Sequence, residues 1–489
     1  MLVLSAAPQR ASAQDSALRY FQGGNMELDV SVSSRLLTGP GTAAVVGGGT
    51  APAIDDPFAV FRNPAGLRYL YDRPRAGFTL HPSIGIKFSS LPIDVQSTIN
   101  RKMDNATRNF LRTGPFEYPQ FGGTLTQQAT SLDALTLTFP QGSWQFGVGF
   151  HRPFYYRVNF LFSGLHERID TIEEDPSDAV AFAIQSKSNS TIAISADTWV
   201  LAAARDVGDA WSAGVSLART YVHFESRSGY RVDGVMVSQG QQYAFNDDSD
   251  PWYNKLNGEM TGGYSGSFYT LRLGTQYVPY EENGWRFGAE LKLSTNATLA
   301  GDFRMVVDEF PALILQAEEG EDNFDVNRIE EVSELTRTYP NRYLTPETVA
   351  LKVPSSISIG VARGMGIRPK LDLTLYLGSL EYEMEIGEKR VFDEAYAFNL
   401  YGKGVRPVYQ AYLGISPGWF FLGVGVISLR DINQGHKDGS GHVIADGKQI
   451  LVPRLDMGFR GRLVDTLSYE LLVDGLPEDV LRLGLTYEF

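Results

Sequence analysis

Charged side chains recur at alternate positions of extended segments whose intervening positions are apolar. Near residue 290, for example, Arg286, Glu290 and Lys292 alternate with leucine and phenylalanine. Successive side chains of a strand point to opposite faces, so these charges would share one face of a sheet. Mixed signs on one face favour a salt-bridged network, although one or two arginines could instead pair with a carboxylate head group. We expect this set to contain Arg272, Arg286, Glu290, Lys292, Asp372, Arg454, Asp456, Arg460, Glu470 and Arg482.

Other residue types that carry chemistry form no recognisable set. The absence of cysteine excludes a disulfide scaffold, a zinc ribbon and thiol catalysis. The six histidines lack ligand spacing, and His166, His436 and His442 have no G-x-S-x-G serine or matching neighbour. We therefore disfavour a lipase or protease and expect no enzyme, metal or cofactor. A net charge of −14 without a basic run also argues against a nucleic-acid partner.

The elements that would position the charged face are strands. Leu481, Leu483 and Leu485 alternate with arginine, glycine and threonine, and similar alternation returns along the chain. The segments span about nine to thirteen residues, which exceeds the usual strand of a soluble sheet and is long enough to cross a membrane. We expect fourteen strands, at 76–88, 132–139, 144–156, 189–205, 210–227, 265–279, 284–300, 354–364, 368–383, 405–416, 419–430, 449–461, 465–474 and 479–489.

The connections between these strands alternate between short and long. Short turns are expected at 140–143, 206–209, 280–284, 364–367, 416–418 and 461–462, and long loops at 89–131, 157–188, 228–264, 301–353, 384–404 and 431–448. Together with aromatic residues at strand ends, this is the pattern of an outer-membrane barrel with short periplasmic turns. The sequence thus predicts an all-β fold, a transmembrane antiparallel β-barrel of about fourteen strands over 76–489. Tyr487 and Phe489, which end the last strand, look like the signal that barrel-assembly machinery reads.

Two kinds of segment fall outside this alternation. Residues 1–13 are interpreted as the remnant of a secretory signal peptide, because a small-x-small sequence follows a short apolar stretch; a disordered tail is the alternative. Helical spacing of apolar residues within 92–112 and 323–337 predicts two loop helices. Such helices would either form the lip of an apolar groove or cap the barrel.

Residues 14–75 precede the barrel and carry a distinctive motif. Asp55 and Asp56 stand ahead of Asn63-Pro64-Ala65-Gly66, which by itself would be only a turn. Directly before a long barrel, this combination resembles the N-terminal hatch of the FadL/TodX family of outer-membrane transporters for hydrophobic compounds. The resemblance implies that 14–75 plugs the lumen, held there by the inward charges. A helical first loop and a long N-terminus depart from the family pattern.

The third strand, 144–156, contains residues that interrupt regular pairing. Proline cannot donate a ladder hydrogen bond, so Pro153 marks either a bulge or gap in the strand or simply its end. In the family that the sequence resembles, ligand leaves sideways through a gap at a kinked third strand. The resemblance therefore implies a lateral opening at Gly147, Gly149, Pro153 and Phe154.

The function implied by the resemblance is passive uptake of long-chain fatty acids or other hydrophobic small molecules across the outer membrane of a Gram-negative-type cell. Its expected partners are the hydrophobic ligand, outer-membrane lipid and the barrel-assembly machinery. The Asn63-Pro64 motif and Pro153 favour transport. The alternative is a PorV-like barrel that acts as a docking component of a secretion system, which the long loops leave open.

Overall fold

The computed structural model describes a large part of the chain. The described residues are 50, 56–70, 73–81, 110–112, 120–127, 131–163, 167–171, 180–238, 241–245, 256–279, 284–307, 346–363, 369–386, 389–391, 394–396, 399–416, 418–431, 449–476 and 480–489. The predicted signal remnant 1–13, Asp55 and the predicted helix at 323–337 lie outside these ranges, as does most of 92–112.

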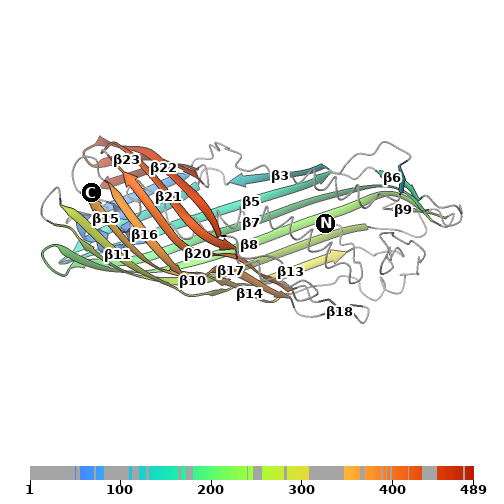
Figure 1. Cartoon of the computed structure of the whole chain (residues 1–489), viewed down its shortest axis with the longest axis horizontal. Coiled ribbons are helices and arrows are strands. Elements are labelled where there is room, and N and C mark those ends of the chain that lie inside the picture. Colours follow the sequence, from blue (N-terminus) through green and yellow to red (C-terminus); the bar gives the residue numbers. More distant parts are fainter. Residues whose placement is uncertain are drawn as a thin grey trace.

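Fourteen antiparallel strands form a closed barrel, as predicted (Figure 1). In order around the wall they are β1 (Arg75–His81), β4 (Ser131–Gln141), β5 (Trp144–Ser163), β7 (Val180–Asp206), β8 (Trp211–Ser238), β10 (Leu256–Tyr277), β11 (Trp285–Ser294), β15 (Ser355–Arg363), β16 (Lys370–Leu377), β20 (Asn399–Ile415), β21 (Phe420–Asp431), β22 (Gln449–Val464), β23 (Leu467–Leu476) and β24 (Val480–Glu488). Pairing of β1 with β24 closes the circle. Closure thus removes the two free edges that an open sheet of these strands would expose to lipid.

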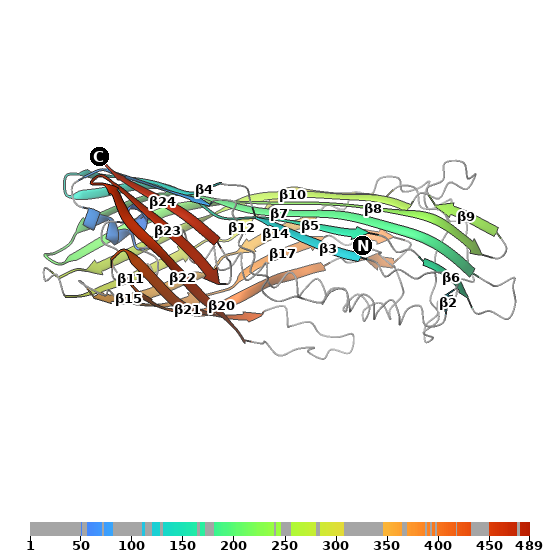
Figure 2. The ribbon, with the colours of Figure 1, turned by 90° about the horizontal axis from the view of Figure 1, so that it is seen from above.

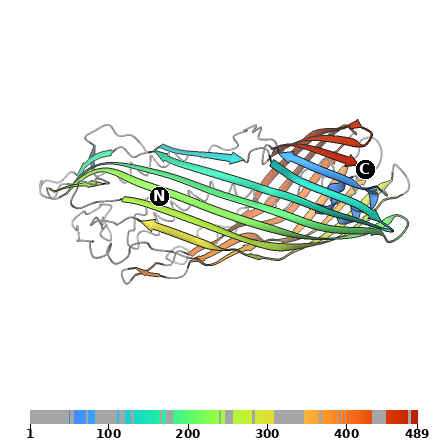
Figure 3. The same ribbon diagram turned by 180° about the vertical axis from the view of Figure 1, so that it is seen from behind.

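Among the described residues, ten further strands extend or flank the wall at the end away from the short turns (Figures 1 and 3). They are β2 (Phe110–Arg112), β3 (Gln120–Gln127), β6 (Glu167–Thr171), β9 (Gln241–Phe245), β12 (Ala297–Thr298), β13 (Ala300–Val307), β14 (Pro346–Lys352), β17 (Leu380–Ile386), β18 (Lys389–Val391) and β19 (Glu394–Tyr396). Along the chain β12 and β13 continue β11, β14 precedes β15, and β17 continues β16. All but β18 and β19 belong to the same sheet as the barrel.

Several sequence predictions about connections are wrong. Much of the loops predicted at 157–188 and 228–264 is strand, because β5, β7, β8 and β10 extend each other's hydrogen-bonded ladders. Strands can form backbone hydrogen bonds without an alternation of apolar and polar side chains, so the alternation in the sequence did not predict these extensions. The described end of 92–112 is strand β2 rather than helix. The turn predicted at 461–462 lies instead between β22 and β23.

Short turns join the strands at the opposite end. The turn between β4 and β5 contains Gly142 at φ 61°, and Gly418 at φ 117° stands between β20 and β21. Glycine adopts this left-handed region without steric cost, which permits the tight reversal.

The outer face of the barrel is apolar and bordered by aromatic rings. Trp211 and Tyr277 contact each other at 5.1 Å near the short turns, and Trp419 stacks on Phe459 at 5.8 Å at the same end. Tyr221 lies about 33 Å from Trp211 along β8, which at the usual tilt gives the ~25 Å height of a lipid-facing band. Both side chains are exposed. This apolar exposure is what a transmembrane barrel requires.

A short helical segment occupies the interior of the barrel. The described part of the chain has two helices, the 3-10 helices η1 (Pro57–Phe61) and η2 (Pro64–Leu70), and both lie within the ring of strands (Figure 2). No helix among the described residues is long and apolar enough to cross a membrane. Their apolar side chains pack against the inner faces of β4, β5, β7 and β8.

We predict that deleting Phe489 will reduce the amount of folded barrel at the cell surface severalfold. The Phe489 ring contacts Tyr487 at 4.8 Å but remains 63% exposed, so its loss removes little packing. The expected defect is therefore in recognition by the assembly machinery. Surface labelling and heat-modifiable migration in cells measure it, with Phe489→Tyr as the control that keeps the ring. Normal surface amounts of the deletion variant would contradict the assembly-signal interpretation.

Candidate functional site

Asn63 fixes the interior segment to the barrel wall. It is only 2% exposed, and its Nδ2 faces the carbonyl oxygens of Thr50 and Thr275, each at 3.1 Å, and of Ala289 at 3.3 Å. Its Oδ1 accepts from the N–H of Ala65 at 3.2 Å, which shapes the turn into η2. Thr275 and Ala289 are paired across β10 and β11. One amide side chain thus joins the turn between the two helices to two wall strands.

The remaining residues of the motif shape the same segment. Asp56, 8% exposed, precedes η1 and accepts from the N–H of Phe58 at 3.0 Å, which caps the first turn. Pro64 begins η2, where the missing N–H costs no helical hydrogen bond. Ala65 and Gly66 are buried against the wall. These residues therefore form and anchor the two helices.

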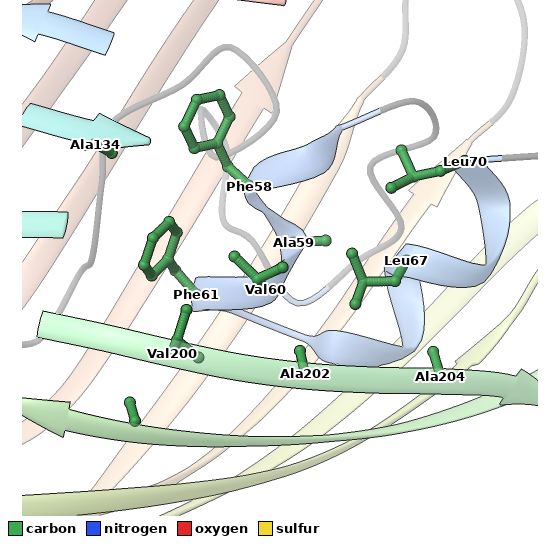
Figure 4. Close-up of a cluster of buried hydrophobic side chains, with 11 residues drawn as sticks. Phe58, Ala59, Val60, Phe61, Leu67, Leu70, Ala134, Val200, Ala202 and Ala204 are labelled. Carbon is green, nitrogen blue, oxygen red and sulfur yellow. The ribbon is translucent and has the colours of Figure 1, made fainter. Parts of the chain in front are cut away.

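Two glycines of β5 provide space for the interior segment. A Cβ at Gly147 would lie 2.5 Å from Val60 Cγ1, and one at Gly149 would lie 2.6 Å from Phe61 Cζ. Both distances are far below van der Waals contact. Figure 4 shows Val60 and Phe61 within the apolar cluster, beside Val200 of β7.

The prediction that Gly147 and Gly149 interrupt the wall is wrong. Both pair without a register break with β4 on one side and with β7 on the other. Glycine is required at both positions because the interior segment fills the space that a side chain on the inner face would occupy. Alternation in the sequence identifies a face but not what packs against it, so the partner was missed.

The turn at Asn63 and Pro64 packs closely against the backbone of two other wall glycines. A Cβ at Gly274 of β10 would collide with Asn63 Oδ1, and one at Gly214 of β8 would lie 2.5 Å from the carbonyl carbon of Pro64. Neither glycine was singled out from the sequence. Their inward-facing positions on strands whose outer faces carry large apolar residues were the available signal.

Pro153 lies inside β5, which continues to Ser163, so the alternative that it ends the strand is wrong. Pairing of β5 with β4 reaches only His151, and pairing with β3 begins at Tyr156. On that edge, residues 152–155 pair with no described residue. β3 and β4 are consecutive along the chain, and residues 128–130 between them lie outside the described ranges.

The other edge of β5 has a β-bulge at the same level. Arg152 and Pro153 together stand opposite the single residue Asp197 of β7, after which the register resumes at Phe154. The guanidinium of Arg152 donates to both carboxylate oxygens of Asp197, at 2.6 and 3.0 Å. This bidentate pair holds β5 to β7 across the bulge.

The predicted inward charges line the barrel interior in pairs. Arg272 donates to Glu290 at 3.1 Å, and Arg454 donates to Asp456 at 2.9 Å. Arg482 donates to Asp133 at 2.7 Å. Lys292, 5% exposed, belongs to the same face, and Arg286 is half-buried on β11 opposite the buried Ala362.

Some of these charges surround a small polar cavity beside the interior segment. Its volume is about 30 Å³, room for about two water molecules and too small for a hydrocarbon chain. It is lined by Thr50, Arg62, Arg272, Glu290, Lys292, Ser356, Ser358, Asp372, Thr374, Tyr376, Gln410 and Tyr412.

An apolar layer lies further along the same wall strands, on the side of the strand extensions. It forms where the line of β11 breaks before β12, where Val353 and Pro354 separate β14 from β15, and where Gly378, at φ 105°, separates β16 from β17. These breaks direct apolar side chains inward. The layer consists of Ala196, Val222, Tyr264, Phe268, Ala297, Leu299, Val353 and Leu380.

No family model matches the sequence, and no curated protein matches it. Among solved structures, it resembles the Ralstonia pickettii toluene transporter TbuX, with 12% identity and a TM-score of 0.42 over 92% of this chain and 98% of that one. The CymD monoaromatic hydrocarbon channel is 13% identical, with a TM-score of 0.43 over 93% of this chain and 98% of that one. A Pseudomonas aeruginosa FadL homologue is 11% identical, with a TM-score of 0.42 over 91% of this chain and 95% of that one. Each likeness is distant, so function has to follow from the interior of this barrel.

We predict that Asn63→Asp will loosen the interior segment while the barrel stays folded. The isosteric carboxylate keeps the acceptor for Ala65 but turns an oxygen towards carbonyls, which should cost about 2–4 kcal/mol of segment binding. Ion conductance in planar bilayers should rise above that of the intact protein. Arg68→Gln is the control, because the exposed Arg68–Asp206 pair (2.6 Å) contributes only about 0–1 kcal/mol. Equal conductance of both variants and the intact protein would contradict the anchoring role.

Proposed function

We propose that the protein is a FadL/TodX-type channel of the outer membrane for passive uptake of hydrophobic small molecules, with long-chain fatty acids as one candidate class. In this proposal residues 14–75 act as a hatch. Ligand enters from the side of the strand extensions, reaches the apolar layer, and leaves sideways at β5. The observation that carries the proposal is an apolar interior layer next to a lumen that the chain itself fills.

The filled lumen argues against a water-filled pore. A ring of fourteen strands is wider than the roughly eight-stranded barrel that wall side chains alone can fill. Here η1 and η2 occupy the space, with Val60, Leu67 and Leu70 fully buried. A hydrophilic solute would have to displace this apolar packing. A hydrophobic solute could instead make favourable contacts with these apolar side chains.

The wall at β5 supports a sideways exit. An unpaired backbone group in hydrocarbon costs several kcal/mol, so a bulge persists in a membrane only where other groups compensate. Arg152 and Pro153 form such a bulge on the edge of β5 that pairs with β7. The bulge at Arg152 and Pro153 lies about 26–30 Å along β5 from the girdle residue Trp144.

Deleting Pro153 tests the exit directly. The deletion removes the extra residue, so Arg152 would stand opposite Asp197 and the existing register would continue at Phe154. We expect the barrel to fold normally and uptake of a labelled long-chain fatty acid to fall severalfold in cells with equal surface amounts of protein. Pro153→Ala is the matched control, because it keeps two residues opposite one and should retain most uptake.

The outcomes separate the competing functions. Unchanged uptake in the deletion variant would mean that ligand does not leave at β5. No uptake above background in the unmodified protein would contradict transport itself. In that case a stoichiometric protein partner, found by native mass spectrometry of the purified protein, would favour the PorV-like docking function.

A further inference from the structure

One arginine interrupts a row of aromatic residues on the outer face of the barrel, at the end away from the short turns. Cross-strand pairing places four residues side by side, one from each of β5, β7, β8 and β10: Phe150, Trp199, Arg219 and Tyr269. Trp199 and Tyr269 are 65% and 47% exposed, and Arg219 is exposed between them. This aromatic row borders the lipid-facing band, where girdle residues are aromatic and a charge is the exception.

Arg219 lies where the outer face of the wall changes from apolar to polar. Toward the short turns, the outward residues of β8 that precede it are Leu217 and Val215, both exposed. In the opposite direction the exposed outward residues include His223 and Glu225. Lipid head groups lie at such a boundary, because hydrocarbon contacts the apolar part and water the polar part. The guanidinium is thus at head-group depth, where a barrel holds an arginine at little cost.

The Arg219 guanidinium is oriented by its neighbours and retains unused donors. Its Nε donates to Ser267 Oγ at 3.2 Å, and its Cζ lies 5.8 Å from the centre of the Tyr269 ring. Neither Nη1 nor Nη2 makes a hydrogen bond or an ion pair with a residue that the structure describes. The N–H groups of these two nitrogens are therefore available to an anion at the membrane surface.

Neighbouring arginines on the same outer face are already paired. Arg152 donates to both carboxylate oxygens of Asp197, which stands in the row next to Arg219. Further along β8, Arg227 pairs with Glu259 at 2.9 Å. The positive charge of Arg219 therefore has no carboxylate partner among the described residues, although the chain as a whole carries a net charge of −14.

The geometry points to a binding site around Arg219 for a phosphate group of the outer-leaflet glycolipid, lipopolysaccharide, on the outer face of β7, β8 and β10. Arginine binds phosphate oxygens through charge-assisted, bidentate hydrogen bonds, which are roughly twice as strong as neutral ones. The acyl chains of the same lipid would lie along Leu201 and Leu217, which form the next cross-strand pair and are 63% and 52% exposed.

A sugar-bearing head group fits this surface better than the small head group of a phospholipid. Beyond the aromatic row the strands continue outside the lipid-facing band, and β8 runs about 56 Å from Tyr221 to its end at Ser238 (Figure 1). The half-buried outward residues closest to the row carry hydroxyl groups, at Ser195, Ser265 and Ser267. A saccharide on the bound phosphate would contact this polar wall, whereas a glycerophosphate head group ends at its base.

This inference rests on the proposed outer-membrane location but not on the proposed uptake, because the site faces lipid and not the lumen. A negative uptake result for the unmodified protein would therefore leave the test of the site unaffected.

Titration of the full-length protein in a non-ionic detergent with diphosphoryl lipid A, followed by native mass spectrometry, tests the site. We expect Arg219→Gln to weaken lipid A binding at least about tenfold, the usual loss with one charge-assisted hydrogen bond. Arg219→Lys keeps the charge but not the fork and should lose less. Arg205→Gln is the matched control, because Arg205 also lies over the ring of its cross-strand partner, Trp144, at 5.2 Å, but at the girdle near the short turns.

Three results would overturn the site. The first is equal affinity of the intact protein and Arg219→Gln for lipid A. The second is an equal loss in Arg219→Gln and Arg205→Gln, which would show only a general effect of girdle charge. The third is binding of phosphatidylglycerol as tight as that of lipid A and equally weakened in Arg219→Gln, which would assign the arginine to phospholipid. Heat-modifiable migration confirms that each variant is folded.

Discussion

The pairing of β1 with β24 is the contact on which the rest of the structure depends. In hydrocarbon every backbone N–H and C=O must be paired, so a sheet can span a membrane only when it has no edge. Closure at fourteen strands meets that requirement but creates a lumen too wide for wall side chains to fill. A lumen of that width holds either water or an interior segment, and this barrel contains a segment. The helices η1 and η2, with the anchoring residue Asn63 between them, supply it.

The wall accommodates that segment by giving up its own side-chain volume. Glycine weakens a strand because it packs nothing and costs more backbone entropy, yet Gly147, Gly149 and Gly274 all stand in strand interiors. Each lies where a helix residue approaches the backbone too closely for a Cβ. The lost strand preference is offset by the burial of Val60 and Phe61. The glycines of the wall and the bulky residues of the segment thus form a single packing unit, although they lie far apart in the chain.

The sequence predicts well what depends on neighbours in the chain and poorly what depends on distant contacts. Period-two alternation identified fourteen strands and the inward face of Glu290 and Lys292, because the face of a strand is a local property. It could not show that β7 and β8 continue far beyond the apolar band, since pairing between polar strands leaves no alternation. Nor could it decide whether Pro153 ends β5 or lies within it. That depends on β3 and β7, which pair with β5 from elsewhere in the chain.

The hydrogen bonds of the wall and those of the interior segment are largely separate sets. Asn63 reaches β10 and β11 through carbonyl oxygens that have a second lone pair, so its removal would leave the ladder between those strands in place. The β5 bulge is likewise held by side chains, through Arg152 and Asp197. Movement of the segment, or of the wall at the bulge, would therefore break few backbone hydrogen bonds in the membrane. The proposed passive uptake would need this separation, because no energy source beyond ligand binding would be available to restore a broken ladder.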